Sequence, residues 1–203
     1  MGLKVEHVNK TYGTKKVVNN ISFEIDKPSV YGLLGTNGAG KTTTIRMILG
    51  ILKKDSGEIS WNGKEVKRKN VNFGYLPEER GVYPKTKIYD QMMYFAELKG
   101  MKKEKAIEAL NYWAKRLEVE QYINMTPEKL SKGNQRKIQF ITSIIHNPEL
   151  VVLDEPFSGL DPVNTEILKS VIIELIKNGK YIIMSSHQMH SIEEFCSDVL
   201  ILN

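Results

Sequence analysis

The 203-residue sequence predicts an α/β protein with a mainly parallel sheet, an N-terminal antiparallel β subdomain and an inserted α-helical subdomain. Three patterns support this fold class. Residues 1–76 are rich in strand-like alternation, residues 88–146 have apolar residues at helical spacing, and strands alternate with helices after residue 150. The last pattern indicates a parallel sheet, because neighbouring parallel strands need a crossover connection between them.

The composition is that of a globular protein long enough to bury a substantial core. Hydrophobic residues make up 41% of the chain and charged residues 26%, close to the average of folded domains. No apolar run approaches the about 18 residues of a membrane span. The formal net charge of +5 fits a lysine-rich surface as well as it fits an anionic partner. We expect one domain over residues 1–203, with a core at 1–83 and 147–203 and the helical subdomain at about 84–146.

Cys196 is the single cysteine, which excludes an internal disulfide framework and fits a reducing compartment. It lies in a segment with apolar neighbours that reads as helical, so we interpret it as a core residue. The four histidines are scattered in the sequence. The sequence therefore predicts no metal site of the histidine–cysteine type.

The secondary structure follows from local periodicity and turn residues. Strands are predicted at residues 5–8, 21–25, 29–34, 58–61, 71–76, 150–153, 181–184 and 199–202. Helices are predicted at residues 43–49, 88–117 with a break at Gly100, 131–146, 163–177 and 190–196.

The most specific motif is the run G-T-N-G-A-G-K-T at residues 35–42, which matches G-x-x-x-x-G-K-[ST] at every fixed position. A predicted buried strand precedes it and a predicted helix follows it. Backbone N–H groups and the helix N-terminus can bind an anion there. Lys41 would reach the β- and γ-phosphates, and Thr42 would offer its hydroxyl to Mg²⁺. We predict a P-loop NTPase core that binds a nucleoside triphosphate through Gly35, Thr36, Asn37, Gly38, Ala39, Gly40, Lys41, Thr42 and Thr43.

An acidic pair follows the apolar strand at residues 150–153. Asp154 is placed at the carboxyl end of this strand, where it could hold Mg²⁺. Glu155 lies one residue further, where a carboxylate can orient and deprotonate an attacking water. Together with the phosphate loop, this pair predicts hydrolysis of the triphosphate.

The segment L-S-K-G-N-Q-R-K at residues 130–137 resembles the L-S-G-G-Q signature of ATP-binding cassette (ABC) ATPases. Lys132 replaces the first glycine and Asn134 replaces the glutamine, and such Ser-Lys-Gly variants are similar to those of the branch that exports drugs, lipids and sodium. The resemblance implies that Ser131, Lys132, Gly133 and Asn134 contact the ATP of a partner subunit. A serine and a glycine that open a helix offer a hydroxyl and free N–H groups to an anion.

Further segments resemble the remaining family motifs, from Val5 to Leu202. Asp161 closes S-G-L-D, which is similar to the D-loop at the dimer interface, and His187 resembles the switch histidine that contacts the γ-phosphate. Tyr12 stands where the family places an aromatic ring against adenine. Glu78 occupies the position of the metal-contacting glutamine, where its carboxylate could reach Mg²⁺ but adds negative charge beside a triphosphate.

The resemblance implies an ATPase subunit of an ABC transporter, with Mg²⁺ as cofactor and ATP as substrate. It implies a head-to-tail ATPase dimer and a separate transmembrane permease that exports cargo. The chain would then be peripheral at the cytoplasmic face of the cell membrane, bound through the permease, and no direct contact with nucleic acid is expected. The alternative is a soluble ABC-type ATPase that acts on ribosomes or nucleic acid. Family members continue past the last predicted strand, so we expect that a C-terminal part of the full protein is missing.

The segment from Glu78 to Phe95 carries more large apolar residues than one helix face needs. Methionine suits a contact surface because its side chain is flexible, and tyrosine suits one because its ring is apolar and its hydroxyl polar. We expect Tyr83, and at least one of Met92 and Met93, to be exposed in the isolated chain and covered by the membrane partner.

Overall fold

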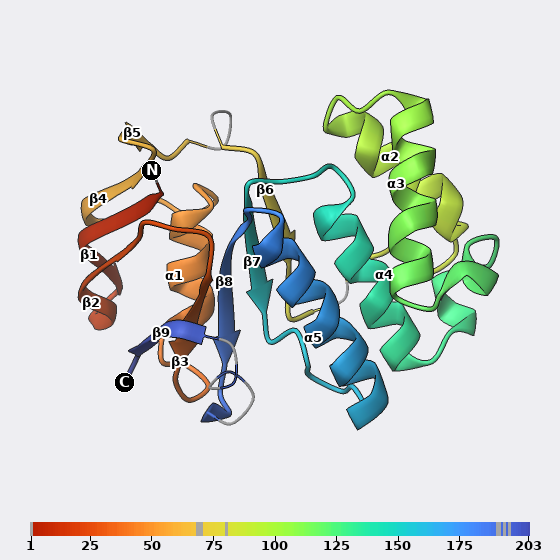
Figure 1. Cartoon of the computed structure of the whole chain (residues 1–203). Coiled ribbons are helices and arrows are strands. Elements are labelled where there is room, and N and C mark those ends of the chain that lie inside the picture. Colours follow the sequence, from red (N-terminus) through yellow and green to blue (C-terminus); the bar gives the residue numbers. More distant parts are fainter. Residues whose placement is uncertain (1, 68–70, 80, 190–191, 193, 195) are drawn as a thin grey trace.

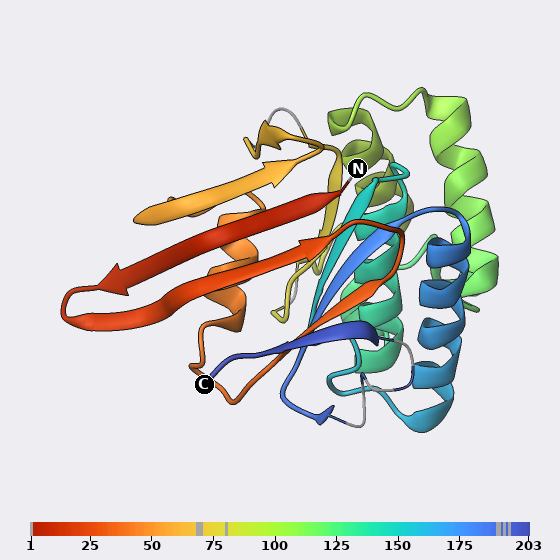
Figure 2. The ribbon, with the colours of Figure 1, turned by 60° about the vertical axis from the view of Figure 1, so that its left-hand side comes forward.

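The computed structural model describes all residues except 1, 68–70, 80, 190–191, 193 and 195. An antiparallel sheet of four strands lies beside a parallel sheet of five (Figure 1). The antiparallel sheet has the order β2-β1-β4-β5, with β1 at Leu3–Tyr12, β2 at Lys15–Ile25, β4 at Ser56–Trp61 and β5 at Lys64–Glu65. Figure 2 shows that the β1–β2 hairpin projects away from the parallel sheet.

The parallel sheet has the order β6-β7-β8-β3-β9, and every neighbouring pair in it is parallel. Its strands are β3 at Val30–Leu34, β6 at Phe73–Leu76, β7 at Leu150–Asp154, β8 at Tyr181–Ser186 and β9 at Cys196–Ile201. Every residue of β3 and of β7 is buried, as expected for parallel strands that are covered on both faces.

Helices cover both faces of the parallel sheet (Figure 1). Helix α1 lies on the side of the antiparallel sheet, and α5 and α4 lie on the other side, with α2 and α3 beyond them. Their bounds are α1 at Lys41–Ile48, α2 at Ile88–Leu98, α3 at Lys103–Arg116, α4 at Lys132–Ile144 and α5 at Pro162–Lys177, with short 3₁₀ turns at Glu120–Tyr122 and Pro127–Lys129.

Strand β7 divides the apolar core into two clusters because its side chains alternate between the two faces of the sheet. Val151 and Leu153 pack in the cluster built by α2 to α5. Leu150 and Val152 pack in the cluster shared by α1 and the antiparallel sheet. Both layers are therefore anchored to the strand that ends at Asp154.

These elements confirm the predicted fold class, with one error near the C-terminus. Cys196, predicted to be helical, is the first residue of β9 and pairs with Val30 of β3. The edge of β3 needs a hydrogen-bonding partner, and this tertiary requirement outweighs the local helical pattern. The predicted helix at 190–196 falls largely outside the described residues. The Cys196 side chain is half-buried against the core, and burial raises the pKa of its thiol to about 12.

Two further observations bear on the sequence predictions. Gly100 has a φ of +78° and separates α2 from α3, as its position predicted. Among the described residues, no helix is both long and apolar enough to cross a bilayer. The division of the chain into a core and a helical subdomain at residues 84 and 146 stays a prediction.

Candidate functional site

The loop at residues 35–40 connects β3 to α1 and is closely packed by backbone on both sides. Gly40 has a φ of +94°, and a Cβ there would lie 2.6 Å from the carbonyl oxygen of Val17. A Cβ on Gly35 would lie 2.5 Å from the carbonyl oxygen of Leu202. No other residue fits at these two positions, because both contacts are with backbone atoms.

The side chain of Lys41 is directed back into this loop. It is only 6% exposed, and its ammonium donates hydrogen bonds to the carbonyl oxygens of Gly35 at 2.6 Å and Thr36 at 3.2 Å. The same Nζ lies 3.7 Å from Oε1 of Glu155. A positive charge is therefore fixed at the loop, beside a carboxylate from the turn that follows β7.

A cleft of about 490 Å³ opens over the loop, within the size range of small-molecule sites. It is lined by Tyr12, Val17, Asn37, Gly38, Gly40, Lys41, Thr42, Thr43 and Glu78. The fold thus brings Tyr12 and Glu78, which are distant in the sequence, to the same cleft as the glycine-rich loop. Ala39 packs against the neighbouring core instead.

Asp154 joins the loop helix to the sheet. Thr42 Oγ1 donates a 3.0 Å hydrogen bond to Asp154 Oδ2, and the Ser185 hydroxyl donates to Oδ1. Ser185 Oγ also accepts a 3.0 Å hydrogen bond from the Glu155 N–H. The sequence analysis missed Ser185, although a serine at the end of the apolar run Y-I-I-M-S-S was a signal that the strand end has a polar neighbour.

Glu155 is a buried carboxylate with an unusual backbone. It is 6% exposed, and its φ of +49° is a costly conformation for a residue with a side chain. Its Oε2 lies 3.0 Å from Nδ1 of His187. Its Oε1 is enclosed and accepts no hydrogen bond from any described residue, and it lies 3.7 Å from the Lys41 ammonium.

The pair Thr42 and Asp154 has the chemistry of a magnesium site. Mg²⁺ is usually held by one or two carboxylates, a hydroxyl and phosphate oxygens, not by a full cage of protein ligands. Over the described part of the chain, no group of three or more His, Cys, Asp or Glu residues is arranged to hold a metal. Glu78 is exposed and lines the same cleft as Thr42.

Tyr12 ends β1 and is 49% exposed. Lys10 Nζ lies 5.5 Å from the centre of its ring and 2.7 Å from Asp55 Oδ1. Asp55 Oδ2 also accepts a 2.7 Å hydrogen bond from the Thr11 N–H. The bond from Lys10, followed by that from Thr11, lowers the pKa of Asp55 below its usual value. Asp55, which the sequence analysis did not select, therefore fixes the strand that carries Tyr12.

The segment at residues 131–134 forms the N-cap and first turn of α4, and none of its residues lines the cleft. Ser131 is its N-cap and accepts a 3.3 Å hydrogen bond from the Asn134 N–H. A Cβ on the buried Gly133 would lie 3.2 Å from Nδ2 of Asn164, and the Asn164 N–H donates a 2.9 Å hydrogen bond to Asp161. The start of α4 and the start of α5 thus contact each other, with Ser131 and Lys132 exposed.

The expected contact surface is present in part. Tyr83 is 56% exposed, as expected. Met92, on the inner face of α2, is fully buried in the core, and Met93 is half-buried against the same core. The expectation that one of the two methionines is exposed is therefore wrong, because helix α2 turns their face toward α3 and α4.

Known proteins resemble this chain over nearly its whole length. The sequence model of a family described as ABC transporter matches residues 18–158. The ABC transporter ATP-binding protein YhaQ of Bacillus subtilis is 52% identical over 98% of this chain and 67% of its own length. The linearmycin resistance ATP-binding protein LnrL of the same organism is 34% identical over 99% of this chain and 66% of its own length.

A solved structure of an ATP-binding subunit of an ABC transporter superposes with a TM-score of 0.91 at 28% identity. The superposition covers 100% of this chain and 86% of that one. With the phosphate loop, the acidic strand end and the signature segment in place, this chain belongs to the ABC transporter family, as an ATP-binding subunit.

Proposed function

We propose that this protein hydrolyses Mg²⁺-bound ATP in the cleft over the loop at residues 35–40 and that Glu155 is the general base. The observation that carries the proposal is the position of the Glu155 carboxylate. Its Oε2 contacts His187, and its buried Oε1 lies near Lys41 without accepting a hydrogen bond from a described residue.

The phosphates would be bound by the loop N–H groups and by the Lys41 ammonium. Lys41 is already directed into the loop by its bonds to the Gly35 and Thr36 carbonyl oxygens. A fixed positive charge in a site with little water stabilises the charge that develops on a transferring phosphoryl group. Tyr12, which is half-exposed and lines the same cleft, would stack on adenine.

Thr42 and Asp154 would hold Mg²⁺, which neutralises charge on the β- and γ-phosphate oxygens when it is bound. Ser185 fixes the second oxygen of Asp154, so that only Oδ2 is directed toward Thr42. Glu78 lines the same cleft as Thr42 and would supply a further carboxylate to the metal.

Glu155 would take the proton of the attacking water on Oε1. A general base must lie within hydrogen-bond reach of the proton it accepts, and Oε1 is the carboxylate oxygen that makes no hydrogen bond with a described residue, although the Lys41 ammonium lies 3.7 Å away. His187 would hold Oε2 and align the γ-phosphate. The strained backbone of Glu155 fixes the direction of the carboxylate.

The exposed start of α4 would complete the cleft of a second copy of the chain. Ser131, Lys132, Gly133 and Asn134 do not line their own cleft, yet they present a helix N-terminus, which favours anions. Asp161 lies next to them through Asn164. We infer a head-to-tail pair in which ATP lies between the loop of one subunit and the signature segment of the other.

The membrane partner would dock beside α2. Tyr83, Tyr94 and Leu98 are each more than half exposed, and the Tyr83 ring stacks on Phe95 with centroids 6.2 Å apart. Large exposed apolar side chains that lie together suggest a covered surface. We propose a separate permease there, at the cytoplasmic face of the membrane, and export as the direction of transport, since LnrL is named for resistance to linearmycin.

The proposal is tested by measuring ATP hydrolysis by the purified protein with Mg²⁺ and with EDTA. We expect Mg²⁺-dependent turnover, and we expect Lys41→Ala to weaken ATP binding because it removes the buried cation of the loop. Copurification from membranes should recover a protein with membrane spans, and Tyr83→Glu should reduce this recovery. Turnover that persists in EDTA, or Lys41→Ala with unchanged ATP affinity, would contradict the proposed site.

A further inference from the structure

Arg136 lies on α4, in the turn of helix that follows the signature segment, and its side chain is buried, with 6% exposed. Sequence analysis gave it no role beyond membership of the run at residues 130–137. Its guanidinium donates to backbone carbonyl oxygens of two separate chain segments, one after β7 and one after β6. A planar guanidinium can do this because its five N–H groups are fixed in a fork.

The first segment is the turn that carries Glu155. Nη2 of Arg136 donates to the carbonyl oxygens of Asp154 at 2.7 Å and Glu155 at 2.8 Å. Nε donates to the carbonyl oxygen of Pro156 at 3.3 Å. Three consecutive peptide groups are therefore held by one side chain.

The second segment carries Glu78. Nη1 of Arg136 donates to the carbonyl oxygen of Pro77 at 2.6 Å and lies 3.4 Å from that of Glu78. The same Nη1 lies 3.4 Å from Oε1 of Gln139, one turn further along α4. Arg136 thus connects α4 to the turn of Glu78, which lines the cleft, and to the turn of Glu155, which lines a separate cavity of about 300 Å³ with His187.

These contacts act on the strained backbone of Glu155. Ser185 fixes its N–H and Arg136 fixes its carbonyl oxygen, so the peptide groups on both sides of a residue with a φ of +49° are held. Without one of these restraints, the backbone would relax toward an ordinary conformation and the carboxylate would turn with it.

We propose that Arg136 is a positioning residue that holds Glu155 in its reactive orientation and couples that orientation to the start of α4. This inference rests on the proposed role of Glu155 as general base. Because Ser131 caps the same helix and Gly133 lies in its first turn, a movement of α4 that accompanies ATP contact at the signature segment would move the Glu155 turn of the same subunit. One ATP site would in this way control the base of the other.

The electrostatic surroundings agree with this role. Burial lowers the pKa of the Arg136 guanidinium to about 10, and the carboxylates of Asp154, Glu78 and Glu155 raise it in the opposite direction. The group therefore stays charged at neutral pH, where charge-assisted bonds to carbonyl oxygens are the strong ones.

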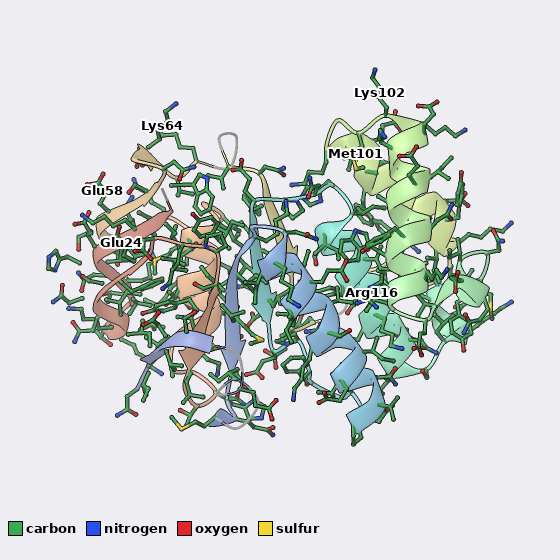
Figure 3. All side chains as sticks on the ribbon, viewed as in Figure 1. Glu24, Glu58, Lys64, Met101, Lys102 and Arg116 are labelled. Carbon is green, nitrogen blue, oxygen red and sulfur yellow. The ribbon has the colours of Figure 1, made fainter. Side chains whose placement is uncertain are left out.

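The test compares Arg136→Gln and Arg136→Lys with a matched control, Arg116→Gln. Arg116 extends from α3 toward α5 (Figure 3), where its Nε lies 2.7 Å from Oε2 of Glu174. The control also removes an arginine that bridges two helices, but it touches no residue of the cleft. Arg136→Lys keeps the charge and cannot reach both turns at once. If thermal unfolding shows that Arg136→Gln is not folded, Arg136→Lys is compared with the control in its place.

We expect both Arg136 variants to lower kcat about 10- to 100-fold, with the affinity for ATP changed less than about threefold, because misplacement of a catalytic group affects mainly the chemical step. Arg116→Gln should keep the kcat of the unmodified protein. In the Glu155→Gln background, Arg136→Gln should cause no further loss, because the group that it positions is already gone.

The outcomes separate this inference from the proposed function. If Glu155→Gln lowers turnover while Arg136→Gln keeps the normal kcat, or if the two losses multiply in the double variant, the positioning role is wrong and the base assignment stands. A normal kcat in Arg136→Lys would also contradict the inference, because it would show that the forked guanidinium is not needed to position Glu155. If Glu155→Gln turns over normally, the base assignment fails and this inference fails with it.

Discussion

Glu155 and His187 meet at 3.0 Å, between Oε2 and Nδ1, although they follow different strands. The contact arises from the register of the parallel sheet, in which Asp154 of β7 pairs with Ser185 of β8. The carboxyl ends of parallel strands lie at the same edge, so the residues that follow the two strands become neighbours. The sheet therefore places the proposed base and the histidine that holds it.

Replacement of this histidine should impair the chemical step more than ATP binding. We expect His187→Ala to lower kcat by about 100-fold, within the usual contribution of positioned acid–base groups, because Oε2 of Glu155 loses its partner. Steady-state hydrolysis and equilibrium binding of ATP measure the two effects separately. A normal kcat in His187→Ala would show that the contact has no part in catalysis.

Thr42→Val should raise the Mg²⁺ concentration needed for half-maximal hydrolysis by about 10- to 100-fold, as is usual when a metal site loses a supporting group. The hydroxyl that contacts Asp154 at 3.0 Å is then absent. A titration of hydrolysis with Mg²⁺ at saturating ATP measures this shift.

Thr44→Val is the matched control for that titration. Thr44 is 1% exposed, and its hydroxyl has no hydrogen-bond partner among the described residues. Valine has the same shape, so we expect unchanged Mg²⁺ dependence and a free energy of unfolding that is equal or higher by up to about 1 kcal/mol. If both variants raise the Mg²⁺ concentration for half-maximal hydrolysis equally, Thr42 is not part of the metal site.

Asp55→Ala should weaken binding of ATP without affecting binding of inorganic triphosphate. Asp55 fixes Lys10 and Thr11, the residues that precede Tyr12. We expect the dissociation constant for ATP to rise about 3- to 10-fold. This loss of binding free energy is a part of the ~1–3 kcal/mol that stacking of a base on an aromatic ring contributes. Competition binding with the two ligands measures the difference, and equal losses for both would contradict a role in base recognition.

His146 should make the protein less stable in mild acid. Its Nε2 lies 3.0 Å from the carbonyl oxygen of Phe73, and burial lowers its pKa from 6.5 to about 4, with Lys99 and Lys180 adding to the effect. Between these two pH values the unfolded chain binds the proton and the folded chain does not. The free energy of unfolding should therefore fall as the pH falls, by up to about 1 kcal/mol per pH unit.

Urea denaturation at pH 7.5, 6 and 5 tests this dependence against His146→Gln. The substitution removes the titrating group, so the variant should lose less stability over this range than the unmodified protein does. An identical pH dependence in the two proteins would show that His146 does not contribute.

The sequence was sufficient to predict the elements that carry strong local signals. The loop at residues 35–42, the acidic end of β7 and the break at Gly100 were all predicted, because glycine, lysine and carboxylate patterns of this kind have few other uses. The comparison proteins confirm the family and the fold class. The roles of the individual site residues stay predictions.

Residues that act through tertiary contacts could not be predicted in the same way. Ser185 and Arg136 bind backbone or carboxylate groups of segments that are distant in the sequence, and neither has a local pattern that reveals this. The local pattern at residues 190–196 predicts a helix that includes Cys196, whereas pairing with β3 makes this residue part of a strand. In each case a long-range partner decides the structure.

The central claim is that Glu155 accepts the proton of the water that attacks ATP. The most direct measurement is the single-turnover rate of Mg²⁺-dependent ATP hydrolysis by Glu155→Gln, alongside its dissociation constant for ATP. An amide has nearly the same shape but cannot accept the proton, so we expect binding within about threefold of normal and a rate lowered by about 100- to 10,000-fold. Hydrolysis at the normal rate by a folded Glu155→Gln protein that binds ATP would contradict the account.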